Sequence, residues 1–479
     1  MKSSISAPAL TISGRKKTRL FTPQQRLILW LACSAIFFEA FDVSIVNLAL
    51  PVIATDLRIS LATTQWIQTV YLLSFGGFLL LGGRLCDYTG SRRIFMTGMF
   101  LFGAASAIAL VSQHISLLLL ARAGQGIGAA LAMPGGISLL ARHFREGPER
   151  QTAIGIFGAF AAVGFAGGLA LGGLIASFFN WHWIFGVNVP VITGVLIAGY
   201  FFIPEEKIKN KAPLNLLTAV WLTATLLLCC YTIHELTRLG WTLLPCLTTA
   251  FLSGIELIRY DKRQQQPFFP LNLFSTPSAY KALGASFLLG ACFLSFIFLC
   301  TLSLFEVMHL DIRSTGLLLF PYSIGSALVS KLLLPRLFRH IRVVQAGRLA
   351  MLCLLGGILL LMVGIYTHHL AWFLAALLLV NSLCIAIGYP AFTILSLSGV
   401  PPAHQGMAAG LQSATYTVGT AMGLSVIGLC LQSFPPPPPT ANHLLLTFVQ
   451  GAYGAFWTSG AVVAAGCMTA LFLLAGRKS

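Results

Sequence analysis

Apolar runs long enough to cross a bilayer, about twenty residues each, recur along the whole chain between short polar and basic segments. Because lipid offers no hydrogen-bond partners, a backbone that crosses it in such a run must be helical. The short alternating segments of a membrane β-barrel are absent from the sequence. Of the 479 residues, 57% are hydrophobic and only 9% are charged, which is more apolar surface than a soluble fold could cover. The sequence therefore predicts an all-α integral membrane protein.

Fourteen membrane helices are predicted, arranged as six, two and six. They are expected near residues 28–50, 64–82, 94–111, 116–140, 152–178, 184–203, 214–233, 241–258, 282–304, 316–335, 347–366, 370–394, 407–431 and 451–475. The chain then divides into a basic cytoplasmic tail at 1–26, a six-helix half at 27–203, a linker with two extra helices at 204–262 and a second six-helix half at 263–479. Two such halves form the parallel repeat of many secondary transporters, with a site between them at the middle of the membrane.

The basic residues indicate how these helices are oriented. Of the 30 lysines and arginines, 24 fall in segments predicted to be cytoplasmic, whereas the outer loops hold only Arg58, Arg238 and Arg313. Loops rich in lysine and arginine stay in the cytoplasm. Both termini are therefore expected there, with the protein in a plasma membrane (the bacterial inner membrane). These clusters account for the net charge of +17, so no nucleic-acid partner is predicted.

Two carboxylates, Glu39 and Asp42, stand inside the first apolar segment. A charge near the middle of a bilayer costs at least about 3 kcal/mol, so an acid there indicates a functional site. Counting about 1.5 Å per helical residue, Asp42 and Arg122 of the fourth segment both lie roughly 9 Å below the outer membrane face. The arginine can therefore neutralise Asp42. Glu39 lies one turn deeper, on the same helical face as Asp42.

An acid in lipid beside a cation can take up and release a proton, which is the requirement for proton coupling. Asp42, Arg122 and Glu39 are therefore the predicted proton-coupling residues. Two alternatives stay open for them. The ion pair could be static and serve only to lock two helices together, or the acids could merely face a polar contact between helices.

Several short motifs lie at defined places along the first half. They comprise residues 42–51 at the end of the first segment, residues 83–93 after the second, Arg122 to Pro134 in the fourth, and the stretch from Trp181 to Phe185. With these motifs the chain resembles, over essentially its full length, the fourteen-span drug:proton antiporter branch of the major facilitator superfamily.

The resemblance implies that the two halves rock about a central site, and that Arg122 takes part in proton transfer. It implies that the loop after the second segment gates this movement through Gly83, Asp87, Gly90, Arg92 and Arg93. The fifth segment carries the glycines of the antiporter motif, which allow close helix approach: Gly155, Gly164, Gly168, Gly172 and Gly173. Leu169 stands where the motif usually has proline, so a straighter helix is expected there.

Polar side chains within the apolar segments are predicted to line the substrate cavity. These candidates are Asn47, Gln125, Asn381, Gln412 and Tyr416. Hydrogen bonding between helices is the open alternative for Asn47, Gln125 and Asn381.

The function that follows is export of small amphipathic drugs or toxic compounds, cationic ones included, in exchange for protons. The eleven cysteines show no metal-binding spacing and no nucleotide-binding loop is present, so neither metal nor cofactor nor enzymatic activity is expected. Export of an endogenous metabolite such as a siderophore is the alternative, and a membrane sensor or integral-membrane enzyme a remote one. Expected partners are the small-molecule substrate, protons and the lipid bilayer. In a Gram-negative cell, an outer-membrane channel and an adaptor are expected as well.

Overall fold

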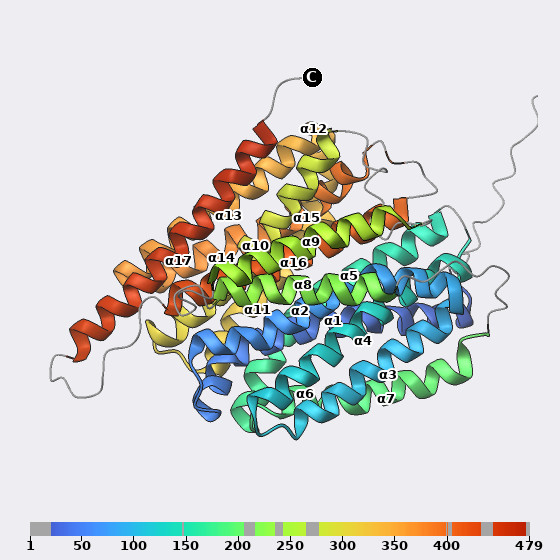
Figure 1. The fold of residues 1–479 in the computed structure, drawn as a ribbon, viewed down its shortest axis with the longest axis horizontal. Coiled ribbons are helices and arrows are strands. Elements are labelled where there is room, and N and C mark those ends of the chain that lie inside the picture. The colour runs from blue at the N-terminus through green and yellow to red at the C-terminus, as the bar shows by residue number, and fades with distance from the viewer. Residues whose placement is uncertain are drawn as a thin grey trace, which may run out of the picture.

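The computed structural model describes residues 21–145, 148–205, 216–234, 243–264, 277–398, 400, 405–432 and 444–475. Within these ranges every regular element is a helix (Figure 1). The first twenty residues of the predicted tail and most of both linkers around the central helix pair lie outside the described residues. The predicted all-α membrane fold is confirmed.

The first half of the chain forms six helical segments. They are α1 (Pro23–Asp56), α2 (Leu61–Thr89), α3 (Ser91–Leu110), α4 (Ile115–His143), α5 (Pro148–Phe178), and the short α6 (Trp183–Gly186) followed by α7 (Asn188–Phe202). The central pair is α8 (Leu216–His234) and α9 (Leu243–Lys262).

The second half begins with α10 (Pro277–Glu306). It continues with α11 (Ile312–Leu328), which runs through a π-helical turn into α12 (Leu334–His340), and with α13 (Val343–Thr367). Another π-helical turn, Leu378–Cys384, joins α14 (Leu370–Leu377) to α15 (Ile385–Ser396), and α16 (Gln405–Gln432) and α17 (Leu444–Ala475) complete the half.

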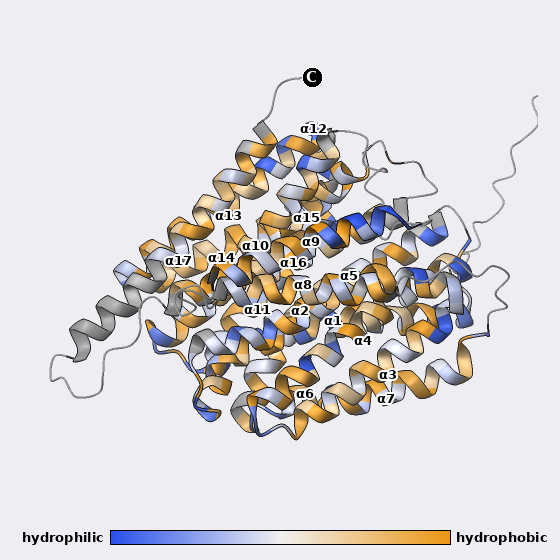
Figure 2. Ribbon diagram, in the orientation of Figure 1, coloured by the Kyte–Doolittle hydropathy of each residue, from blue (hydrophilic) through white to orange (hydrophobic). Residues whose placement is uncertain are grey.

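Eleven helical segments in the described ranges are long and apolar enough to cross a membrane. The three other predicted spans are occupied by α8, α9 and α17, so the total of fourteen and the division into 6+2+6 stay predictions. Hydropathy follows the same pattern, since hydrophobic residues cover the helix bodies and hydrophilic ones gather toward helix ends, most clearly in α9 (Figure 2).

Helix α1 lies in the interior of the first half, against α2, α4 and α5. Its start is fixed by Thr22, whose side chain accepts a hydrogen bond from the backbone N–H of Gln25, and by a proline at the first helical position. Every residue from Ala40 to Ala54 is buried except Val52. A helix that is apolar on all sides belongs in such an interior position, and this places Asp42 out of contact with lipid.

Several glycines of α5 bring this helix against its neighbours. A Cβ added at Gly164 or Gly168 would collide with the backbone of α1, and one added at Gly173 would lie 2.9 Å from the carbonyl oxygen of Ile312 in α11. At Gly155, by contrast, an added Cβ would meet nothing within 4 Å. Helix α5 therefore touches the second half near its C-terminal end, while Gly155 near the other end faces open space. Leu169 is buried inside one unbroken helix.

Candidate functional site

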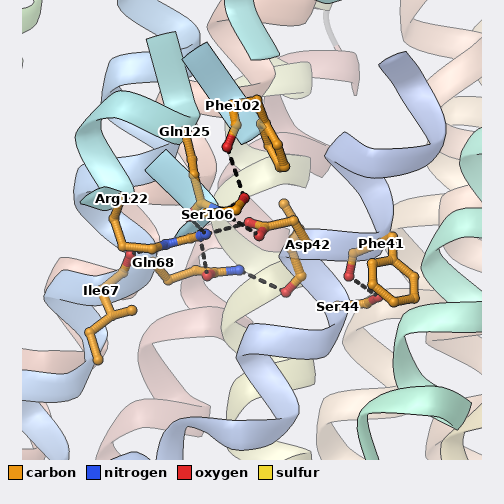
Figure 3. A network of polar contacts seen from close by, with 10 residues as sticks. Phe41, Asp42, Ser44, Ile67, Gln68, Phe102, Ser106, Arg122 and Gln125 are labelled. Carbon is orange, nitrogen blue, oxygen red and sulfur yellow. Dashed lines mark hydrogen bonds and ion pairs between the residues drawn. The ribbon is translucent and has the colours of Figure 1, made fainter. Parts of the chain in front are cut away.

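Asp42 of α1 and Arg122 of α4 form an ion pair in the interior of the first half (Figure 3). Both side chains are fully inaccessible to solvent. The counting of helical residues placed these two groups at one depth, and the structure brings them into direct contact. The contact joins Arg122 Nη1 to Asp42 Oδ2.

Neighbouring groups accept hydrogen bonds from the other N–H groups of the Arg122 guanidinium. Its Nε donates to the carbonyl oxygen of Ile67 at 2.9 Å, Nη2 donates to Gln68 Oε1 at 3.1 Å, and Nη1 also donates to Gln125 Oε1 at 2.8 Å. The guanidinium carbon lies 4.2 Å from the ring centre of Tyr71, a cation–π contact. Arginine suits this site because its planar fork serves several acceptors at once.

Gln125 holds the second oxygen of the carboxylate. Its Nε2 donates to Asp42 Oδ1 at 3.2 Å and to Ser106 Oγ at 2.9 Å, while Gln68 Nε2 donates to the carbonyl oxygen of Val43 at 2.8 Å. The resulting network joins α1, α2, α3 and α4. Breaking a buried ion pair by removing one partner typically costs about 3–5 kcal/mol, so this network fixes the relative positions of four helices.

Gln125 is predicted either to line the substrate cavity or to form hydrogen bonds between helices, and in the structure it is hydrogen-bonded to Asp42 and Arg122. The spacing explains this, since a residue three positions after Arg122 on a helix projects from the same face. Gln68 and Ser106 were not singled out at all. A polar amide at position 68, inside an otherwise apolar segment, was the signal available for one of them.

Glu39 is in a different environment from Asp42. Its side chain is only partly buried, and it forms no hydrogen bond or ion pair with the residues that the structure describes. Two aromatic side chains of the second half, Tyr389 and Tyr416, lie on α15 and α16. The two tyrosine rings meet edge to face with centres 5.1 Å apart. A carboxylate with no partner among the described residues and a pair of aromatic rings are the kinds of group that bind organic cations.

The other predicted cavity residues make contacts between helices. Asn381 Nδ2 donates to Ser323 Oγ at 3.0 Å, and Gln412 Nε2 donates to Ser286 Oγ at 2.8 Å. Asn47 accepts a weak bond of 3.4 Å from Thr301 across the two halves, and its own Nδ2 is buried without a partner. Asn381 and Gln412 are thus engaged within the second half, whereas Asn47 retains a free donor where the halves meet.

The predicted gating loop is a tight turn between α2 and α3. Gly90 adopts a φ of 102°, a conformation that favours glycine. Arg92 donates to the carbonyl oxygen of Tyr200 at 2.7 Å and pairs with Glu205 at 3.3 Å, while Arg93 is exposed. A Cβ at Gly83 would meet nothing within 4 Å, so no close approach requires that glycine.

The side chain of Asp87 lies outside the described part of the loop. The described contacts of the turn join α3 to the end of α7, and the gating role implied by the resemblance stays a prediction.

Comparisons with known proteins agree with this architecture. The family model described as Major Facilitator Superfamily matches residues 32–424. The cephamycin export protein CmcT of Amycolatopsis lactamdurans is 32% identical over 406 residues, which cover 83% of this chain and 83% of that protein. The lincomycin resistance protein of Streptomyces lincolnensis is also 32% identical, over 81% of this chain and 80% of its own length.

Solved structures of low sequence identity share the fold. An auto-inhibited peptide transporter of the POT family superposes with a TM-score of 0.66 at 15% identity, covering 96% of this chain and 98% of that one. The nucleoside transporter NupG gives a TM-score of 0.64 at 12% identity, covering 93% and 99% of the two chains. The protein is therefore a multi-pass membrane transporter and not an enzyme. The chain belongs to the major facilitator superfamily.

Proposed function

We propose that the protein exports small amphipathic drugs or other toxic compounds in exchange for protons, as a member of the fourteen-span drug:proton antiporter branch. The names of its relatives, which include export and resistance proteins for several antibiotics, support the substrate class. The observation that carries the proton coupling is the ion pair of Asp42 and Arg122, fully enclosed among four helices. We place the protein in a bacterial inner membrane with both termini in the cytoplasm.

Protonation of Asp42 removes its negative charge and with it the ionic part of the contact to Arg122. The guanidinium keeps its neutral acceptors at Ile67, Gln68 and Gln125. A ligand or proton shifts a two-state equilibrium only by the difference in its binding free energy between the two states. Proton coupling therefore requires that the ion pair stabilises one orientation of the two halves more than the other. Protonation of Asp42 then shifts the equilibrium toward the orientation that depends less on the ion pair.

Substrate would bind between the halves, near Glu39, Tyr389 and Tyr416. The free carboxylate attracts a cationic group, and the phenol rings offer flat apolar surfaces for the rest of an amphipathic molecule. The loop at Gly83, Asp87, Gly90, Arg92 and Arg93 would then latch one orientation. In a Gram-negative cell the exported compound would pass to an outer-membrane channel and adaptor.

Transport by purified protein in lipid vesicles tests this function. With a pH-sensitive dye inside the vesicles, an outward gradient of ethidium, puromycin or lincomycin should drive proton movement in the opposite direction. An imposed pH gradient should in turn drive uptake of the same compound, since coupling between two ligands is reciprocal. Substrate movement that ignores the pH gradient would exclude antiport, and a lack of movement of all three compounds would point away from drug export.

Glu39→Gln is expected to change the substrate range while leaving proton coupling in place. The amide keeps the size of the side chain but removes the charge that the proposed substrate site offers to a cation. Transport of the cation ethidium should fall about tenfold or more, since an opposite charge in a protein interior is worth about 1.4 kcal/mol or more. Transport of a neutral substrate in the same vesicles should change less than twofold. An equal loss of transport for the cationic and the neutral substrate would show that Glu39 does not distinguish substrates by their charge.

A further inference from the structure

A groove runs along the outer surface of the first half between α3 and α7. Its apolar part has a volume of about 510 Å³ and is lined by Met96, Phe100, Leu196 and Phe201 among others. Figure 1 shows the two helices side by side at the margin of the bundle, away from the second half. Phe100 is 63% exposed and Phe201 72% exposed, so the groove opens toward the surrounding hydrocarbon of a membrane.

Close contacts between a glycine of one helix and a side chain of the other bring α3 and α7 together along this groove. A Cβ at Gly199 would lie 2.6 Å from Met96 Sδ, and one at Gly103 would lie 2.9 Å from Ile192 Cγ2. The helices therefore approach closely where a glycine faces a larger side chain. Large apolar side chains of both helices lie on either side of this contact and form the walls of the groove.

The groove continues into a second cavity of about 320 Å³ at the start of α3. Met96, Thr97 and Tyr200 line both cavities, which makes them one continuous surface. The second cavity is also lined by Arg92 and Arg93. Arg93 is exposed and forms no hydrogen bond or ion pair with any residue in the described ranges. The apolar groove therefore ends at the second cavity, which is lined by basic side chains and is called the basic mouth below.

One acidic side chain also lines this mouth. Glu205 offsets part of the charge through its pair with Arg92, but its own side chain is 85% exposed to solvent. The charged side chains that line the second cavity are Arg92, Arg93 and Glu205, so together they carry a net charge of +1.

We propose that this surface binds one anionic phospholipid of the membrane leaflet that faces the loop between α2 and α3. One acyl chain lies in the apolar groove between α3 and α7. The phosphate lies at Arg93, in the second cavity. A free anion would use the mouth but would gain nothing from the groove, and an uncharged lipid would use the groove but not the mouth. The continuity of the two cavities therefore favours a ligand with both parts.

Native mass spectrometry of the purified full-length protein tests the site. Phosphatidylglycerol and phosphatidylcholine with identical acyl chains are titrated separately, and inorganic phosphate is added as a third probe. Phosphatidylglycerol should bind more tightly than phosphatidylcholine. Arg93→Gln should reduce this preference about fivefold, the usual effect of one basic residue beside an anionic headgroup. Arg263→Gln, which removes an exposed arginine at the end of α9, is the matched control and should leave the preference unchanged.

Thr97→Trp tests the groove itself, because Thr97 lies where the two cavities meet. The indole should fill the groove and reduce the binding of both lipids by a similar factor. Thermal unfolding without added lipid checks that each variant is folded. The proposal is overturned if Arg93→Gln and Arg263→Gln act alike, or if inorganic phosphate displaces the lipid while Thr97→Trp has no effect. It is also overturned if Thr97→Trp instead abolishes association with a second copy of the chain.

Discussion

Asp42→Asn is expected to abolish proton-coupled transport and to lower the stability of the protein. Asparagine has nearly the same shape and can still accept a hydrogen bond, but it leaves the guanidinium of Arg122 buried without a counter-charge. Loss of one partner of a buried ion pair typically costs about 3–5 kcal/mol of unfolding free energy. Proton movement driven by an ethidium gradient, measured in vesicles, should fall to the level of empty vesicles.

A matched control removes a carboxylate outside the membrane interior. Asp311 is exposed and begins α11, where its side chain accepts the backbone N–H of Ser314. Hydrogen bonds from the side chain of Ser314 and from backbone N–H groups lower the pKa of Asp311, so the group is ionised at neutral pH and Asp311→Asn also removes one charge. Asparagine caps a helix as well as aspartate does. Transport and stability of this variant should stay close to those of the unaltered protein.

A double variant separates a structural role of Asp42 from a coupling role. Asp42→Asn with Arg122→Gln removes both charges and so removes the cost of an unpaired buried ion. Stability should return at least in part, whereas proton coupling should remain absent because no group is left to exchange the proton. If coupled transport returns together with stability, Asp42 serves only to hold the helices.

Gly168→Ala is expected to destabilise the protein by about 1–3 kcal/mol, the usual cost of overpacking. The new Cβ would collide with Ser44 and with the backbone of Phe41 in α1. Alanine is intrinsically the better helix former by about 1 kcal/mol, so a net loss can come only from the contact with α1. The measurement is thermal unfolding of the purified protein in detergent.

Gly155→Ala in the same helix is the control for this substitution. It makes the same chemical change, but its Cβ would meet nothing within 4 Å. The gain in helix propensity then stands alone, and the variant should unfold at the same temperature or slightly higher. Equal destabilisation by both substitutions would show that the close packing of α1 and α5 is not what the glycine at 168 provides.

Much of the site was predictable from counting along helices. Because the lipid core fixes depth, a residue number within a span gives the position of Asp42 and Arg122 along the membrane normal, and a buried charge then requires its partner. The glycine pattern also follows from helical geometry. Gly164, Gly168 and Gly172 recur every four residues on one face.

The remaining features depend on rotations and contacts that the sequence does not specify. Gly155 precedes Gly164 by nine residues, a turn of roughly 180°, so the antiporter motif combines two opposite faces of one helix. The edge-to-face contact of Tyr389 with Tyr416 joins two separate helices and arises only when they pack against each other. Gln68 and Ser106 became recognisable as partners of the ion pair only once α2 and α3 were placed beside α4.

Those two faces give α5 a mechanical role. On one face, Gly168 brings its backbone against α1 beside Asp42, and on the opposite face Gly173 brings it against Ile312 of the second half. Backbone in direct contact with backbone leaves no flexible side chain to absorb a displacement, and packed interfaces shift between discrete arrangements instead of deforming gradually. Helix α5 thus adds a second link between α1 and the second half, beside the direct contact of Asn47 in α1 with Thr301 in α10. We expect a displacement of α1 to move α5 and, with it, the contact at Ile312.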